Sequence, residues 1–230
     1  GAFIGAAALG AVAATVLLLL RDGESEQPAK SRTADATVDW RLLMSTPMVM
    51  NFLFFTLLAF TTFGFMNVSV VALGALYNTP ATTANAVLSG YLVLTALGVL
   101  AGGLVAARTT RHGLTAVLGI LVATVATFLI SLFDLPAPLL IAAASLAGFA
   151  LGLIMPARDM IVRSVTPPGA FGRVFGFVTN GFNIGGIISP LVFGPLMDHD
   201  APRLVFVVIA IGGLLGIATV AGVPRRSSAP

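Results

Sequence analysis

The sequence predicts an all-α membrane protein with seven transmembrane helices, arranged as one helix followed by a six-helix half-bundle. Charged residues make up only 9% of the chain and hydrophobic residues 57%, whereas a soluble domain carries about 25% charged residues. Uncharged runs recur along the whole sequence. Each reaches the roughly 20 residues that a helix needs to cross a hydrocarbon core of about 30 Å.

The uncharged runs place the helices in order. The run 42–107 is too long for one crossing and contains the turn sequence "YNTPATTANA" at 77–86, so it predicts two helices joined by a short loop. The first run begins at Gly1 with neither a methionine nor a basic leader, so we expect a helix inside a longer protein rather than a signal peptide. The predicted crossings are 1–20, 47–76, 84–107, 113–133, 136–160, 171–196 and 202–223.

Between the first and second crossings lies a segment of different composition. Residues 21–46 are polar and carry both signs of charge, with too few apolar residues to form a core, so they predict a flexible linker. The chain therefore divides into a helix (1–20), a linker (21–46), a six-helix bundle (47–223) and a tail (224–230).

Basic residues lie almost entirely on one side of the predicted membrane. If the loops alternate sides, all of the 12 lysines and arginines except Arg203 fall on the side of the linker and the tail. The excess of basic residues in cytoplasmic loops makes this side cytoplasmic. We expect an integral protein of the bacterial plasma (inner) membrane, with the lipid bilayer around it and a cytoplasmic C-terminus.

The sequence lacks the residues that several classes of protein require. The chain has no cysteine, and its two histidines, His112 and His199, stand alone, so no metal site is expected. The basic residues form no stripe, so no nucleic-acid partner is expected. A membrane-embedded enzyme would need H-E-x-x-H, paired intramembrane acids or a catalytic dyad. None is found, and this class and a non-transporting scaffold remain as alternatives to a transporter.

Three motifs resemble the major facilitator superfamily. The stretch "GGLVAARTTRH" at 102–112 is similar to that family's loop signature, G-G-x-L-A-D-R-x-G-R-R, with departures at Ala107 and Thr110. Residues 172–198, which include Pro190 and end in a G-x-x-x-D at Gly194 and Asp198, resemble the family's eleventh helix. The sequence "GLIMPARD" at 152–159 resembles the inner end of its tenth helix.

The resemblance implies the C-terminal half of a secondary active transporter, from the sixth helix to the end. It implies that the missing N-terminal half is a partner and that the substrate is a small molecule, moved by alternating access. It implies neither an enzyme nor a cofactor.

Three asparagines are candidates for substrate binding. Asn180 and Asn183 lie near mid-depth of a predicted helix, about 60° apart on one face. Gly181 and Gly185 lie on a different face, which we expect to pack against a neighbouring helix. Because an amide facing lipid would lack partners, we expect both asparagines to face a cavity, with Asn67 as a further lining residue. The alternative is that these amides only tie helices together.

A conformational latch is predicted from the loop signature and consists of Gly103, Arg108, Arg111 and Asp159. Asp159 is expected to pair with Arg108 or Arg111, or alternatively with Arg163 at i+4. The helix 136–160 places Arg158 and Asp159 at its cytoplasmic end, so no charge is expected at mid-depth.

Small residues four apart recur in the predicted helices and favour close packing of helices in lipid. The pairs are Gly98 and Gly102, Gly148 and Gly152, Gly172 and Gly176, Gly181 and Gly185, and Gly212 and Gly216.

Overall fold

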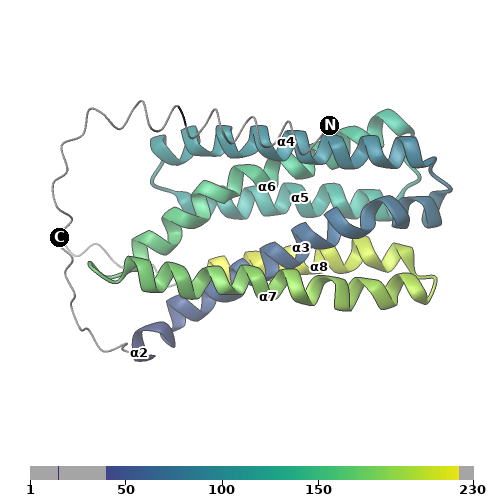
Figure 1. The fold of residues 1–230 in the computed structure, drawn as a ribbon. Coiled ribbons are helices and arrows are strands. Elements are labelled where there is room, and N and C mark those ends of the chain that lie inside the picture. The colour runs from purple at the N-terminus through teal and green to yellow at the C-terminus, as the bar shows by residue number, and fades with distance from the viewer. Residues whose placement is uncertain (1–14, 16–39, 223–230) are drawn as a thin grey trace. The chain divides into compact units, whose positions relative to one another are not determined.

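The computed structural model describes residue 15 and residues 40–222, and every regular element in these residues is an α-helix. A short helix, α2 (Trp40–Leu43), precedes six long ones (Figure 1). Each of the six is long and apolar enough to cross a membrane, which confirms the predicted six-helix bundle. The predicted helix 1–20 apart from residue 15, most of the linker and the tail 224–230 lie outside the described residues. The long helices are α3 (Thr46–Tyr77), α4 (Ala81–Arg108), α5 (His112–Leu132), α6 (Ala137–Val165), α7 (Phe171–Asp198) and α8 (Pro202–Ala221).

Proline and asparagine set several helix boundaries. Pro47, Pro138 and Pro202 stand in the first turns of α3, α6 and α8, where the missing N–H has no partner to lose. At the end of α3, Asn78 adopts the left-handed conformation with φ of 52°, and its N–H donates to the carbonyl of Leu73. Asparagine tolerates this conformation better than most residues, so α3 and α4 join in a tight hairpin at the predicted turn.

Helix α6 runs further than the sequence indicated. It ends at Val165 rather than near residue 160, and the Pro167–Pro168 pair that follows cannot continue it. Arg158 is therefore seven residues, or about 10 Å, inside the end of the helix. The expectation that Arg158 and Asp159 lie at the helix end is wrong, because the helix is ended by the proline pair and not by the first charges.

The six long helices pack in the order α4–α6–α5–α8–α3–α7, and α4 and α7 at the two ends of this series have no extensive contact with each other. Successive helices run in opposite directions (Figure 1). The α4–α5 turn, with Arg108 and Arg111, therefore lies at the same end of the bundle as the α6–α7 loop. We call this the arginine end. The opposite end, with Asp134 and Asp198, is the acidic end.

The most extensive helix contact is the glycine seam between α4 and α6. A Cβ built on Gly98 or Gly102 of α4 would clash with the backbone of Phe149 or Leu153 in α6. Gly148 and Gly152 of α6 approach the α4 backbone at Tyr91 and Thr95 in the same way. These two predicted pairs thus face each other, and side-chain-free positions let the two backbones touch. By contrast, a Cβ on Gly172 or Gly176 would meet nothing within 4 Å.

The outer surface of the helices is apolar. Leu100 on α4 and Leu191 on α7 are each 69% exposed. Many further leucines, valines and isoleucines are exposed on all six long helices. An apolar surface of this extent is unfavourable in water and is matched by lipid. Together with six helices of spanning length, it defines an integral membrane protein.

Candidate functional site

A charged side chain lies inside the bundle, where α6 faces α3 and α7. The guanidinium carbon of Arg158 is 4.5 Å from the ring centre of Phe55 in α3 and 5.1 Å from that of Phe182 in α7. Both distances are typical of cation–π contacts. The Arg158 side chain is only 16% exposed. We name Arg158, Phe55 and Phe182 the arginine cage.

The cage leaves most of the hydrogen-bonding capacity of Arg158 unused. Its Nε lies 3.3 Å from Oδ1 of Asp159, which is the next residue in the chain. Its Nη1 is buried and has no hydrogen-bond partner among the described residues. Buried donors without a partner are unfavourable, so an acceptor from outside the described residues would stabilise this group.

The glycines of α7 lie on a face that packs against a neighbouring helix, as the sequence predicted. Gly181 and Gly185 are buried, and a Cβ on either would clash with the α3 backbone at Phe52 or Thr56. Asn180 and Asn183 are exposed on the rest of the helix. Neither amide is sealed between helices within the described chain. Their role in substrate binding stays a prediction.

Asn67 does not lie with the other two asparagines. Helices α3 and α7 run in the same direction, and the contacts of Gly181 with Phe52 and of Gly185 with Thr56 fix their register. This register puts Asn67 level with Leu196, thirteen residues beyond Asn183, or about 20 Å along the helix axis. Asn67 is exposed near the acidic end of the bundle, so it could contact only a different part of any substrate path.

The predicted latch residues lie at one end of the bundle but are not paired in this conformation. Arg108 and Arg111 are exposed, and a Cβ on Gly103 would meet nothing within 4 Å. The glycine seam places Arg108 level with residues 159–165 of α6. Asp159 nevertheless pairs with Arg158, and in residues 40–222 no ion pair joins it to Arg108, Arg111 or Arg163.

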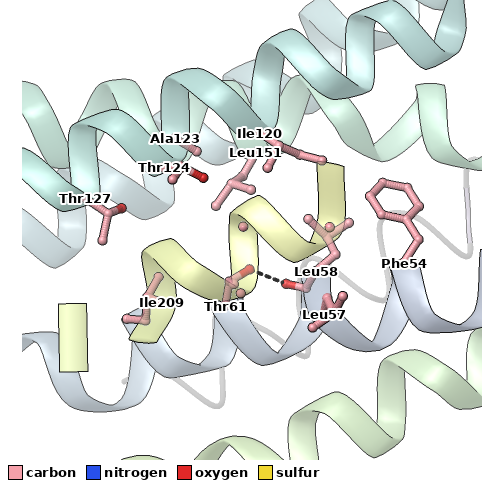
Figure 2. Close-up of a pocket in the computed structure, with 13 residues that line it drawn as sticks. Phe54, Leu57, Leu58, Thr61, Ile120, Ala123, Thr124, Thr127, Leu151 and Ile209 are labelled. Atoms are coloured by element: carbon pink, nitrogen blue, oxygen red, sulfur yellow. Dashed lines mark hydrogen bonds between the residues drawn. The ribbon is translucent and has the colours of Figure 1, made fainter. Parts of the chain in front are cut away.

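A small, partly open pocket lies elsewhere, between α3, α5, α6 and α8 (Figure 2). It has space for about 20 Å³ and is lined by apolar side chains and by Thr61, Thr124 and Thr127. The hydroxyl of Thr61 donates to the carbonyl of Leu58 at 2.9 Å, as Figure 2 shows. A space of this size holds about one water molecule, so the pocket is too small to be a site for a transported compound.

The arginine cage is not predicted by the sequence. An Arg-Asp pair in an otherwise apolar run is typical of a helix end. The signal that could have found it is the continuation "MIVRSV" after the pair, which extends the helix up to Pro167. The two phenylalanines come from other helices, and no local pattern indicates that they contact Arg158.

Six helices of membrane-spanning length with an apolar outer surface define an α-helical integral membrane protein. Residues 52–230 match the family model of the Major Facilitator Superfamily, and the chain therefore belongs to this family. No curated protein matches the sequence.

Solved structures show the same fold. The chain is similar to a peptide transporter, POT, in complex with sulfate, with a TM-score of 0.68 and 21% identity over 76% of this chain and 37% of that chain. A mutant of POT in complex with alafosfalin gives a TM-score of 0.67 and 23% identity, over 76% of this chain and 38% of that chain. A POT family transporter in complex with a thioalcohol-conjugated peptide gives a TM-score of 0.65 and 20% identity, over 75% of this chain and 37% of that chain. The chain thus covers less than two fifths of each transporter.

Proposed function

We propose that this chain is the C-terminal half of a secondary active transporter that moves a small molecule across the membrane by alternating access. The observation that carries the proposal is the incomplete cover of α4 and α7. In the most apolar 18-residue stretch of each helix, only 17% of α4 and 28% of α7 are buried. These are the two lowest values among the six long helices. These helices are also the two ends of the packing series, which suits a second bundle that rocks against them.

The orientation and the partners follow from this proposal. The arginine end is the cytoplasmic end, and the protein lies in the bacterial plasma membrane with its C-terminus in the cytoplasm. The second bundle is the missing N-terminal half. The substrate site lies between the two halves, near Asn180 and Asn183 on the free side of α7, with Asn67 further toward the outer end.

Alanine at Asn180 or Asn183 should lower transport while leaving the fold intact. Loss of one hydrogen bond to a substrate corresponds to a reduction of about 3- to 10-fold, and an exposed amide contributes little to stability. The measurement is uptake of a panel of radiolabelled amino acids, dipeptides, monocarboxylates and drugs into proteoliposomes that contain the full natural transporter. Melting temperature is recorded in parallel.

Asn85→Ala is the matched control, because Asn85 is an exposed asparagine on α4 whose amide donates to the local carbonyl of Ala81. If all three variants transport equally well, the asparagine site is wrong. If the unmodified protein transports nothing in the panel and no counterflow is seen, the transporter proposal itself fails.

The latch proposal predicts that Asp159 approaches Arg108 in the opposite transport state. These 230 residues contain no cysteine, so in a transporter whose other half is also free of cysteine the double variant Arg108→Cys/Asp159→Cys offers a single crosslinking pair. A short bifunctional thiol reagent should join the two sites in one ligand condition and not in the other. The pair Arg108→Cys/Arg163→Cys serves as the control, and equal crosslinking of the test pair in every condition would contradict the latch.

A further inference from the structure

Arg158 is a charged residue within a transmembrane helix, and such residues are rare in membrane proteins. It lies about 10 Å before the C-terminal end of α6, in contact with Phe55 of α3 and Phe182 of α7. Each ionisable residue within a transmembrane helix is by default a candidate for a substrate or ion pathway. The three helices that meet at the arginine cage include α7, the helix whose free side carries the asparagines of the proposed site.

The unused donors of Arg158 indicate what the cage can bind. A guanidinium has five N–H donors in a planar fork. In the described part of the chain only the Nε–H has an acceptor, the carboxylate of Asp159, and Nη1 is buried without one. The rings of Phe55 and Phe182 lie against the guanidinium and cannot accept bonds in its plane. An oxyanion with two oxygens matches such a fork best.

Two more unpartnered polar atoms lie on the neighbouring helices at this depth. Thr179 Oγ1 on α7 and Asn51 Oδ1 on α3 are both buried without a hydrogen-bond partner. The register of α3 and α7 places Asn51 level with Asn180, one residue beyond Thr179. Phe55 and Phe182 follow these two residues by about one helical turn. The region therefore holds an unsatisfied donor together with unsatisfied hydroxyl and amide oxygens.

Nearby charge and apolar surface narrow the class of ligand. Asp159 is 44% exposed and adjoins the guanidinium, so a dianion would be repelled more strongly than a monoanion. Phe63 packs edge-on against Phe182 with ring centres 5.6 Å apart, which extends the aromatic surface beside the cage. We propose that the arginine cage binds the carboxylate group of an amphipathic monocarboxylate. The assignment rests on the proposed transport function and names its substrate class.

The test compares two molecules of nearly the same size, one with a carboxylate and one with a neutral carboxamide in its place. Binding of 2-naphthoate and of its neutral amide, 2-naphthamide, is measured by equilibrium dialysis with the full natural transporter in detergent. We expect 2-naphthoate to bind saturably and at least about tenfold more tightly, because a charge-assisted bidentate pair is lost with the amide. Arg158→Met should abolish this preference. Asp159→Asn should increase the affinity for 2-naphthoate, because it removes the competing carboxylate.

Arg163→Met is the matched control, since Arg163 is exposed on the same helix, and it should keep the preference. If Arg158→Met does not fold, Arg158→Lys retains the charge but not the fork and should reduce the preference without abolishing it. Equal affinity for acid and amide in the unmodified protein overturns the proposal, as does an Arg158 variant with an unchanged preference. Dialysis needs no transport, so loss of flux with the acid preference retained would refute the transport function and not the cage.

Discussion

Alanine at Gly102 should destabilise the bundle strongly, whereas alanine at the adjacent Gly103 should not. A Cβ on Gly102 would lie 2.5 Å from the carbonyl oxygen of Leu153 and 2.9 Å from its Cα. These are backbone atoms and cannot rotate away, so α4 and α6 must separate. Overpacking of this kind costs about 1–3 kcal/mol even where side chains can adjust, and we expect the upper part of this range. Gly152→Ala should behave in the same way, because its Cβ would clash with the carbonyl oxygen of Thr95.

Gly103→Ala tests the interpretation, because the two glycines are neighbours on one helix and differ only in what they face. The Cβ of Gly103 would meet nothing within 4 Å, and alanine favours a helix over glycine by up to about 1 kcal/mol. Gly103→Ala should therefore melt at or above the temperature of the unmodified protein. Thermal unfolding in detergent, followed by circular dichroism and size-exclusion chromatography, measures both variants. Similar melting temperatures for Gly102→Ala and Gly103→Ala would show that the seam is not as tight as the structure has it.

The second large effect follows from the proposal that this chain is half of a transporter, and it concerns the chain by itself. Purified residues 1–230 in proteoliposomes should show no saturable flux of any compound that the complete transporter carries. Alternating access requires a second bundle to rock against, and α4 and α7 are the least covered of the long helices. Adding the separately expressed N-terminal half should restore flux if the two halves assemble on these surfaces.

A leak control decides what a positive result means. Liposomes with the chain alone are tested with a trapped fluorescent dye, so that flux through a damaged bilayer is not counted as transport. Saturable, dye-tight uptake by the chain alone would contradict the half-transporter proposal. Failure of the reunited halves to transport, with both folded, would contradict the surfaces proposed for their assembly.

The sequence was sufficient to predict the transmembrane helices, because an uncharged run is a local property of the sequence and the thickness of the bilayer sets the length of each crossing. It was not sufficient for the end of α6, because Arg158 resembles a boundary charge although the helix continues to Val165, just before Pro167. Glycine spacing identified Gly98 and Gly102 as a packing face, yet the same spacing at Gly172 and Gly176 meets nothing. Spacing alone does not say which face has a neighbour. The arginine cage joins three helices and depends on contacts between residues more than 100 positions apart, such as Phe55 and Arg158.

The order in which the helices pack contains an internal two-fold symmetry. Exchanging α3 with α6, α4 with α7 and α5 with α8 turns the α4–α6 contact into α7–α3 and the α5–α6 contact into α8–α3, and leaves α5–α8 unchanged. The two triplets start at opposite ends of the bundle (Figure 1), so they form an inverted repeat. Asn67 and Arg158 each lie twenty-one residues after the first residue of their helix. The two copies of the repeat therefore carry a polar side chain at the same position. The amide of Asn67 lies toward one membrane surface and the guanidinium of Arg158 toward the other.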